Sequence, residues 1–325
     1  MQKEEESGGQ QLLVSEEEMR RAADLIARAK RLVVFSGAGI SAESGIATFR
    51  DPEMGLWTSK IGLAWFGTPV GWRWTPGLAW RMYLSRFRDP IARARPNPGH
   101  YAIARLEQLI DQGQALGKDV PRHFDILTQN VDGLHQRAGN KETSVAELHG
   151  TVNRHICSKH RHPHPYVIDP STLAEDYDPE KDEFFTHDSK KVPRCQVEGC
   201  GSYLRPDAVL FMESLPSHAW NAADHAVSSG DVMLVVGTSG VVYPAASLPE
   251  EALEKRGVHV IEINPVPSAI SSRVSMFLKG PSGQILPPLV DMVRERWQLE
   301  GSDGKKNERE TSSESEKDNY EEAEE

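Results

Sequence analysis

Gly37 and Gly39 are the residues whose type and spacing suggest chemistry most directly, because they follow the apolar run RLVVFS. Glycines between a buried strand and a helix let the backbone approach a pyrophosphate, and the helix N-terminus favours anions. The G-x-G-x-x-A pattern over 37–42 therefore indicates a dinucleotide site, although an ordinary tight turn is the alternative. A dehydrogenase needs a second strand ending in Asp or Glu about 20 residues later. The irregular run GIATFRDPEMGLW at 45–57 argues against that architecture.

Strand and helix patterns that could position this loop alternate along the chain. Four apolar runs are typical of strands buried on both faces of a parallel sheet: RLVVFSGAG at 31–39, FDILTQN at 124–130, DVMLVVGTS at 231–239 and VHVIEINP at 258–265. Helical periodicity lies between them, at about 16–30, 97–115, 216–229 and 246–256. The alternation predicts an α/β fold with a Rossmann-like, doubly wound parallel sheet.

Two stretches interrupt this rhythm and predict a smaller inserted module. Residues 51–96 are rich in Trp, Gly and Pro, and we expect an amphipathic helix over 76–89, capped by Thr75 and stopped by Pro90. Residues 150–206 contain all three cysteines. The expected sheet domain then consists of 16–50, 97–149 and 207–299. The polar segments 1–15 and 300–325 are expected to be disordered acidic tails, the second either an interaction tail or merely a solvated one.

Composition excludes several classes of protein. The chain has 325 residues and a net charge of −11, most of it in the tails, so the body has no basic excess for nucleic acid. Three cysteines do not make a disulfide scaffold, and no apolar run is long enough to span a membrane. The acidic N-terminus resembles neither a secretory signal nor a transit peptide, which favours cytoplasm or nucleus.

Five motifs, in order, resemble the sirtuins, the NAD-dependent protein lysine deacylases. They are GAGISAESGIATFR at 37–50, TQNVDGLHQRAG at 128–139, ELHG at 147–150, GTSGVVYPAA at 237–246 and INP at 263–265. The resemblance covers about residues 20–295 and implies removal of acyl groups from lysine, giving nicotinamide and O-acyl-ADP-ribose. It also implies that acylated-lysine proteins are the partners.

The resemblance assigns roles around the dinucleotide. It makes His149 the general base, which suits an imidazole with an ordinary pKa near 6.5, and Asn130 the second catalytic residue. On their own, His149 would more simply be a structural turn residue, and the loop after 128 would be ordinary capping. The expected cofactor-binding residues are Gly37, Ala38, Gly39, Ser41, Phe49, Arg50, Gln129, Asn130, Asp132, Gly237, Thr238, Ser239 and Asn264.

Tyr83 and Arg86 point to one branch of the family. They match the Tyr-x-x-Arg of the class III sirtuins, which remove succinyl, malonyl and glutaryl groups, and Thr48 fits the same branch. Three residues apart on a helix, they would share one face, where an Arg and a Tyr hydroxyl can bind a carboxylate. The alternative is a solvated Arg beside a half-buried Tyr. This branch also raises the mitochondrion as an alternative compartment.

The resemblance further implies a site for the substrate peptide. Residues 207–214 (DAVLFMES) and 241–244 (VVYP) would hold it between them as an added strand. The family usually has Gly where this chain has Met212. The expected contact residues are Val209, Phe211, Glu213, Val241 and Tyr243.

The metal site departs from the family pattern of four cysteines. Here the first pair is Cys157 and His160, three apart, and the second is Cys195 and Cys200. Three thiolates and an imidazole make an accepted structural zinc site, so we expect one Zn²⁺ per chain with these four ligands. The competitors for the fourth position are His155, His162 and His164. A metal-free remnant is the alternative.

Two other functions stay open at this point. A protein ADP-ribosyltransferase could use the same scaffold, transferring the ribose to a protein side chain. A non-catalytic module could bind NAD or acyl-lysine, although the presence of His149 and Asn130 speaks against it.

Overall fold

A computed structural model describes residues 14–48, 67–164 and 192–299. The two predicted tails lie outside these ranges except at Val14, which is buried in the core, and Ser15, which caps the first helix. Its main layer is a six-stranded sheet in the order β3-β2-β1-β7-β8-β9, and every pair of neighbours is parallel. The strands are β1 (Arg31–Ser36), β2 (His123–Thr128), β3 (Val145–Glu147), β7 (Val232–Val236), β8 (His259–Asn264) and β9 (Met276–Lys279). The predicted doubly wound parallel sheet is confirmed.

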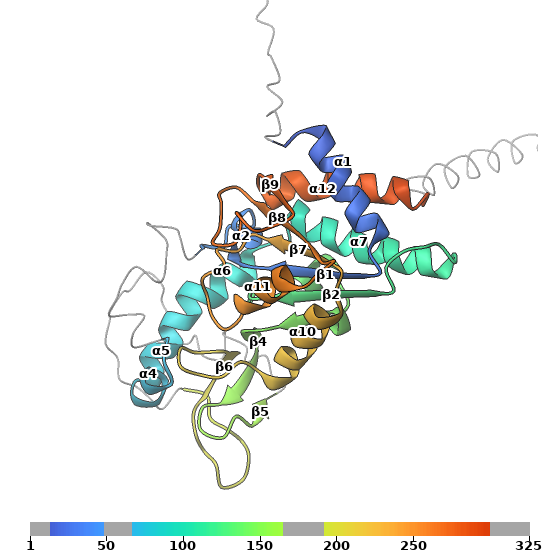
Figure 1. Cartoon of the computed structure of the whole chain (residues 1–325). Helices are drawn as coiled ribbons and strands as arrows, with labels where there is room; N and C mark the ends of the chain where they lie inside the picture. The colour runs from blue at the N-terminus through green and yellow to red at the C-terminus, as the bar shows by residue number, and fades with distance from the viewer. Residues whose placement is uncertain (1–13, 49–66, 165–191, 300–325) are drawn as a thin grey trace, which may run out of the picture.

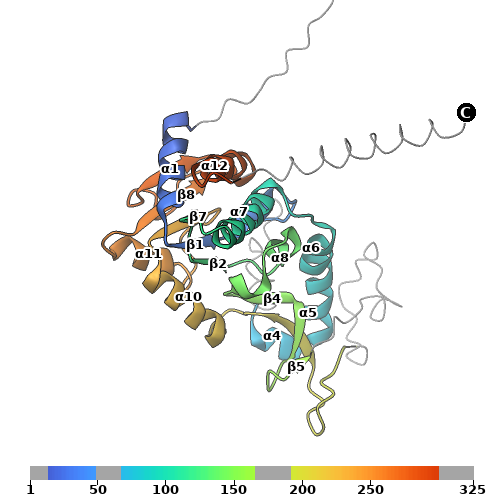
Figure 2. The same ribbon diagram turned by 90° about the vertical axis from the view of Figure 1, so that its right-hand side faces the viewer.

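Helices cover both faces of this sheet (Figures 1 and 2). Side chains along each strand point alternately to the two faces, so each face has its own hydrophobic core. Leu32 and Val34 of β1 point into one core, while Val33 and Phe35 point into the other. The first core is closed by α1 (Glu16–Arg28), α7 (Pro98–Ala115) and α12 (Ser282–Arg296). The second is closed by α10 (Ser217–Ser229) and α11 (Ser247–Glu254). No described helix is long and apolar enough to cross a membrane.

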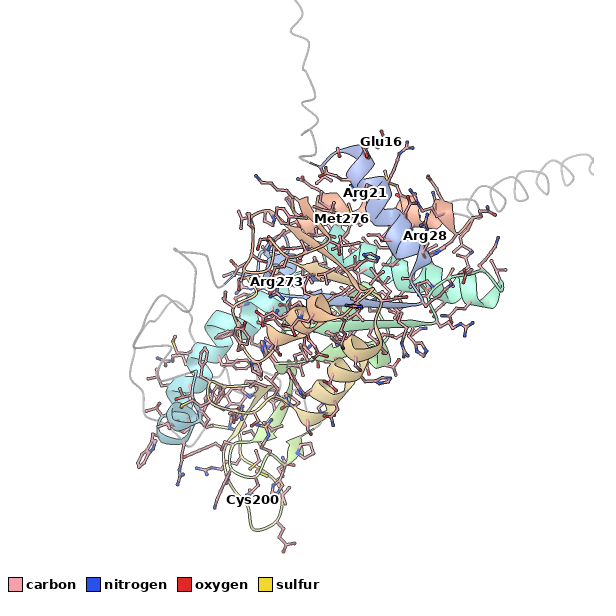
Figure 3. All side chains as sticks on the ribbon, viewed as in Figure 1. Glu16, Arg21, Arg28, Cys200, Arg273 and Met276 are labelled. Carbon is pink, nitrogen blue, oxygen red and sulfur yellow. The ribbon has the colours of Figure 1, made fainter. Side chains whose placement is uncertain are left out.

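A smaller module packs beside the sheet and is built from the two segments expected to be inserted. A three-stranded antiparallel sheet has the order β5-β4-β6, with β4 (Gly150–Cys157), β5 (Pro163–His164) and β6 (Leu204–Ala208). A third hydrophobic core joins β4 and β6 to α4 (Pro69–Trp74), α5 (Pro76–Tyr83) and α6 (Asp89–Arg93). Cys200 lies at the end of the molecule remote from Glu16 of α1 (Figure 3). The remaining short elements are α2 (Ala38–Ala42), α8 (Leu134–Ala138) and the 3₁₀ turn η2 (Glu142–Ser144).

The helix expected over 76–89 differs from the prediction at both ends. Thr75 makes no side-chain cap to α5, because its hydroxyl donates instead to the carbonyl of Gly71. At the other end a π-helical turn, η1 (Leu84–Arg88), carries the chain on into α6. Pro90 does not stop the helix, because it falls in the first turn of α6, where a missing N–H costs nothing.

Two buried histidines lie behind the edge of the sheet. The rings of His100 on α7 and His135 on α8 are 5.3 Å apart, and each has one ring nitrogen without a described hydrogen-bond partner. Burial lowers the pKa of His100 to about 3 and that of His135 to about 4. Both rings are therefore neutral in the folded protein near pH 7.

This pair predicts an acid-sensitive fold. Below about pH 6.5 the unfolded chain takes up protons at both histidines, whereas the folded chain does not until pH 3–4. The free energy of unfolding should therefore decrease as the pH is lowered across this interval, by up to about 1.4 kcal/mol per pH unit for each ring. The free energy of unfolding, measured with urea at several pH values, should depend less steeply on pH in His100→Asn than in the wild type. His259→Gln, at an exposed position, should keep the wild-type dependence. An unchanged slope in His100→Asn would contradict the prediction.

Candidate active site

The candidate site lies where the strand order changes direction. In the sheet, β2 and β3 lie on one side of the neighbouring pair β1 and β7, and β8 and β9 lie on the other side. The carboxyl ends of β1 and β7 therefore flank a topological switch point, the usual place for a ligand in an open α/β sheet. The predicted cofactor residues that the structure describes follow β1, β2 or β7, or end β8 in the case of Asn264, so they meet at this one edge.

Two glycine turns meet at the switch point in direct backbone contact. The N–H of Gly39 donates to the carbonyl of Gly237 at 2.7 Å, and the N–H of Gly37 donates to that of Val236 at 3.0 Å. A Cβ on Gly39 would lie 2.6 Å from the Gly237 oxygen. Only glycine allows this approach, which leaves the start of α2 open to a phosphate group.

Asn130 and Asp132, after β2, are tied to the glycine turn through Ser41. The Asn130 amide donates to the Ser41 hydroxyl at 3.1 Å and to the Gly37 carbonyl at 3.2 Å. Ser41 in turn donates to Asp132 at 2.7 Å, and the N–H of Leu134 donates to the other carboxylate oxygen at 2.9 Å. Burial raises the pKa of Asp132, and these two hydrogen bonds oppose that effect. The network fixes the Asp132 carboxyl group at this edge of the sheet.

The side towards β8 carries Gln129, Thr238 and Asn264. The amide of Gln129 donates to the Thr238 hydroxyl at 3.0 Å, and that of Asn264 donates to the Thr238 carbonyl at 2.8 Å. Next to Thr238, the carbonyl of Ser239 accepts from the N–H of Ala269. Loops that are far apart in the sequence thereby form one continuous rim. Phe49 and Arg50, two expected cofactor residues, lie outside the described residues.

His149 stands at the junction of the sheet domain and the small module, just before β4. Its Nδ1 is 2.9 Å from the carbonyl oxygen of Gln129. A carbonyl only accepts, so Nδ1 carries the proton and Nε2 keeps a lone pair. Burial lowers the pKa of His149, and the hydrogen bond to Gln129 opposes this. The ring is therefore a neutral base near pH 7.

The two segments expected to hold a peptide differ in how their side chains point. Phe211, Val241 and Tyr243 are exposed, and Val209 is partly exposed, its N–H donating to the His149 carbonyl at 2.8 Å. Glu213 instead turns inward. It makes a 2.5 Å ion pair with Arg205, whose side chain is only 2% exposed.

Arg205 and Met212 carry structural roles that the sequence pattern did not reveal. Arg205 also donates to the Ala208 carbonyl at 2.9 Å, so the Glu213 pair holds the turn that follows β6. Met212, at the usual glycine position, has φ +70° and is 84% exposed. It adopts the left-handed conformation that glycine adopts without cost.

Tyr83 is buried rather than open to the cleft. It packs edge-on against Trp72 and Trp80, and its hydroxyl donates to the Val152 carbonyl at 3.0 Å. A cavity of about 120 Å³ lies beside it, lined also by Arg88 of η1. Arg86 lies in the same π-helical turn, but its side chain is outside the described residues.

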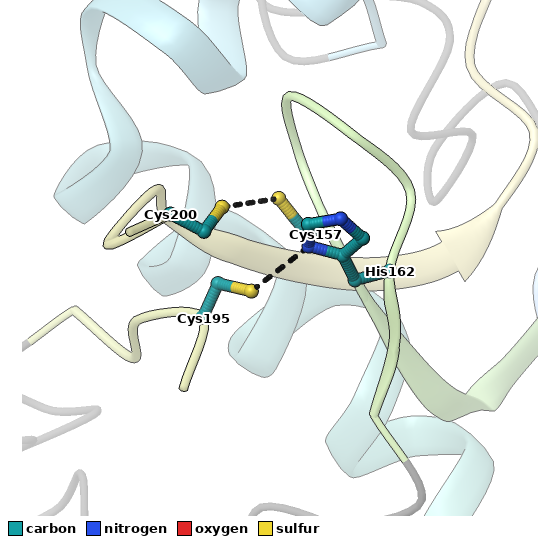
Figure 4. A group of neighbouring side chains, drawn as sticks. All are labelled: Cys157, His162, Cys195 and Cys200. Atoms are coloured by element: carbon teal, nitrogen blue, oxygen red, sulfur yellow. Dashed lines mark hydrogen bonds between the residues drawn. The ribbon is translucent and has the colours of Figure 1, made fainter. Parts of the chain in front are cut away.

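The cysteines gather as expected, but with a different histidine. Cys157, His162, Cys195 and Cys200 place one ligand atom each within 4.8 Å of the others. Figure 4 shows Cys200 facing Cys157 at 3.5 Å, and Cys195 facing the Nδ1 of His162 at 3.4 Å.

The histidine that joins the cluster is the competitor His162 and not the expected His160. Arg161 has φ +55°, so the chain turns sharply between the two histidines and the main-chain N–H of His160, not its ring, faces the Cys157 sulfur. His155 stacks on Trp80 instead, and the side chain of His164 is outside the described residues.

The glycine contact predicts a large cost for one methyl group. Gly39→Ala would push a Cβ against the Gly237 carbonyl, so we expect a loss of about 1–3 kcal/mol of stability together with a distorted turn. Gly45→Ala is the control, because Gly45 has φ +79° but no atom within 4 Å of an added Cβ. Urea unfolding measures both. Gly45→Ala measures the cost of backbone strain without a clash, and a Gly39→Ala protein as stable as the wild type would show that the close approach does not constrain the fold.

Comparisons with known proteins agree with this geometry. The NAD-dependent protein deacylase 2 of Pyrobaculum aerophilum is 44% identical over 274 residues, 84% of this chain and 95% of that protein. A Sir2 homologue solved with NAD has a TM-score of 0.67 at 34% identity, covering 85% of this chain and 93% of the other. A Sir2 protein bound to a myristoylated histone peptide has a TM-score of 0.58 at 32% identity, covering 86% and 98%. The profile described as the Sir2 family matches residues 37–244, and the chain belongs to that family.

Proposed function

We propose that this NAD-dependent protein deacylase removes acidic acyl groups, such as succinyl and malonyl, from protein lysines. The observation that carries the deacylase function is the neutral His149. Its Nε2 keeps a lone pair that can take a proton, at the same sheet edge where the glycine turns and Asn130 meet. Relatives named NAD-dependent protein deacylase support the same reaction class.

NAD is a substrate of this reaction, and when bound it supplies the electrophilic ribose carbon that receives the acyl oxygen. The chain's own residues bind, orient and move protons. The glycine turns suit a pyrophosphate, because Gly37, Gly39 and Gly237 place no side chain at the switch point. Asp132 suits the amide NH₂ of nicotinamide, since a carboxylate accepts. His149 takes a proton at Nε2 from a ribose hydroxyl.

The peptide substrate fits the exposed pair of segments around Phe211 and Val241. Phe211 and Val241 expose apolar side chains, Tyr243 is 60% exposed, and the N–H of nearby Val209 donates to the His149 carbonyl. An extended peptide could add a strand between them and present its lysine to the cleft. A Sir2 relative has been solved with a bound myristoylated histone peptide, which supports an acylated peptide as the substrate here.

The preference for an acidic acyl group rests on arginine more than on tyrosine. The hydroxyl of Tyr83 is committed to the Val152 carbonyl, so it could help a carboxylate only by breaking that bond. Arg86 matches the branch pattern, and Arg88 lines the cavity beside Tyr83. A guanidinium offers two parallel donors to a carboxylate, which an apolar pocket could not bury alone.

Nicotinamide release tests the proposed function directly. The full chain would be incubated with NAD and matched peptides carrying acetyl-, malonyl-, succinyl- or glutaryl-lysine. Release that depends on the acyl peptide, fastest with acidic groups, is expected. Faster release with acetyl peptides would contradict the acidic preference but not the deacylase function, whereas release with none of the peptides would contradict both.

Loss of His149 should remove the base and leave the nucleotide site. His149→Ala should lower deacylation by about 10²–10⁴-fold, while NAD still binds. Because burial lowers the pKa of His149, wild-type kcat/KM should fall only below a midpoint under pH 6.5, as the ring becomes protonated. His259→Ala, at an exposed position, is the control. Near-normal turnover by folded His149→Ala would refute this role.

Arg86→Met should separate acidic from neutral substrates. An unpaired buried carboxylate costs roughly 2–5 kcal/mol, so desuccinylation should fall about 30- to several-thousand-fold while deacetylation changes little. Arg93→Met, on the exposed side of α6, is the matched control, and Arg88→Met tests the neighbouring cavity. An equal loss of both activities would make Arg86 structural. A selective loss in Arg88→Met alone would transfer the role to Arg88.

We further propose that the cysteine–histidine cluster holds one structural Zn²⁺. Three thiols and one imidazole are a complete tetrahedral donor set with no open position. Cys157 ends β4, and Cys195 and Cys200 lie in the segment that leads into β6, so the metal would tie β4 to the start of β6. It would support the fold and take no part in the reaction.

Metal analysis distinguishes the two histidines. Zinc content should be one per chain, and His162→Ala should bind zinc at least about tenfold more weakly than the wild type. His160→Ala should retain the metal, because its ring lies outside the cluster. Thermal unfolding should follow metal content. Weaker zinc binding by His160→Ala than by His162→Ala would make His160 the fourth ligand. A folded wild type without zinc would refute the site.

A further inference from the structure

Glu262 is a carboxylate buried at the end of β8, directly behind the rim of the cleft. It is 0% exposed. One oxygen accepts from the Ser271 hydroxyl at 2.6 Å, and the other lies 3.4 Å from the Asn264 amide nitrogen. Among the described residues no Lys, Arg or His nitrogen forms an ion pair with it. Its negative charge is therefore uncompensated at short range, and a buried charge acts over a longer distance than an exposed one.

This carboxylate helps to fix which atom Asn264 presents to a ligand. The two amide hydrogens of Asn264 have two acceptors behind them, the Thr238 carbonyl at 2.8 Å and the Glu262 carboxylate. A flipped amide would place its oxygen against both acceptors. The side-chain oxygen is thus the atom left for a ligand, and it can only accept. The Asn264 side-chain oxygen can accept a hydrogen bond from a ligand hydroxyl, and it repels a ligand oxygen that carries no hydrogen.

The part of the ligand that reaches Asn264 follows from the topology. The glycine turns at the switch point take the pyrophosphate, and Asp132 and His149 lie on the β2 and β3 side. The other nucleoside must extend over β7 and β8, where Asn264 ends its strand. This placement rests on the proposed use of NAD.

We infer that Glu262 is a specificity-determining residue that makes the site accept the free adenosine ribose of NAD and reject the 2′-phosphate of NADP. It acts through the orientation of Asn264 and through its own negative charge, without touching the nucleotide. A 2′-phosphate offers only acceptor oxygens to Asn264, and it carries a negative charge like Glu262. Lys279 pairs with Asn264 across the sheet, but it is exposed and water screens its charge.

Binding of two product-like nucleotides tests this inference without the deacylation chemistry. Calorimetry would compare ADP-ribose with 2′-phospho-ADP-ribose on the full chain. The wild type should prefer ADP-ribose by at least about 30-fold, and Glu262→Gln should shrink that ratio by about tenfold, mainly by strengthening the phosphorylated ligand. Glu262→Asp keeps the charge and should keep most of the preference.

Glu107→Gln is the matched control. Glu107 is also a buried glutamate with neutral partners, Asn140 at 2.8 Å and Ser144 at 2.5 Å, but it lies on α7. Its variant should keep the wild-type ratio.

Three results would overturn the inference. The first is equal affinity of the wild type for both nucleotides, which decides the matter even if Glu262→Gln does not fold. The second is an unchanged ratio in folded Glu262→Gln. The third is binding of neither nucleotide by folded wild type, which would overturn the proposed use of NAD as well.

Discussion

The contact between the two glycine turns is the constraint on which the rest of the site depends. Where the Gly39 N–H meets the Gly237 carbonyl, the loops after β1 and β7 lie closer than any side chain would permit. Ser41 and Asn130 then connect this contact to β2, and Thr238 connects it to β8. A shift of one turn would therefore move the groups on both sides of the switch point.

Polar groups around this contact are each oriented by neighbours of fixed hydrogen-bonding type. The Gln129 carbonyl sets the tautomer of His149, and the Thr238 carbonyl with Glu262 sets the amide of Asn264. Asp132 is held between two donors and keeps its carboxylate beside the cleft. Such preorganisation matters because a buried polar group with a fixed partner need not reorganise when a ligand arrives.

Much of this arrangement could be predicted from the sequence, because apolar runs and the motifs at their ends determine which loops share a sheet edge. Where the prediction failed, the deciding contacts were not periodic. Pro90 was expected to stop a helix, but a π-helical turn placed it in the first turn of the next one. His160 has the ligand spacing, but the left-handed Arg161 gives the place to His162. The burial of Tyr83 depends on Trp72 and Val152, which no local pattern links to it.

The most direct test of the account is the fate of the acyl group. Mass spectrometry of a reaction between the full chain, NAD and a succinyl-lysine peptide would follow every product. We predict equal amounts of nicotinamide, free-lysine peptide and O-succinyl-ADP-ribose, because the acyl oxygen attacks the ribose and His149 completes the transfer. ADP-ribose attached to protein, or free succinate formed without consumption of NAD, would contradict the account.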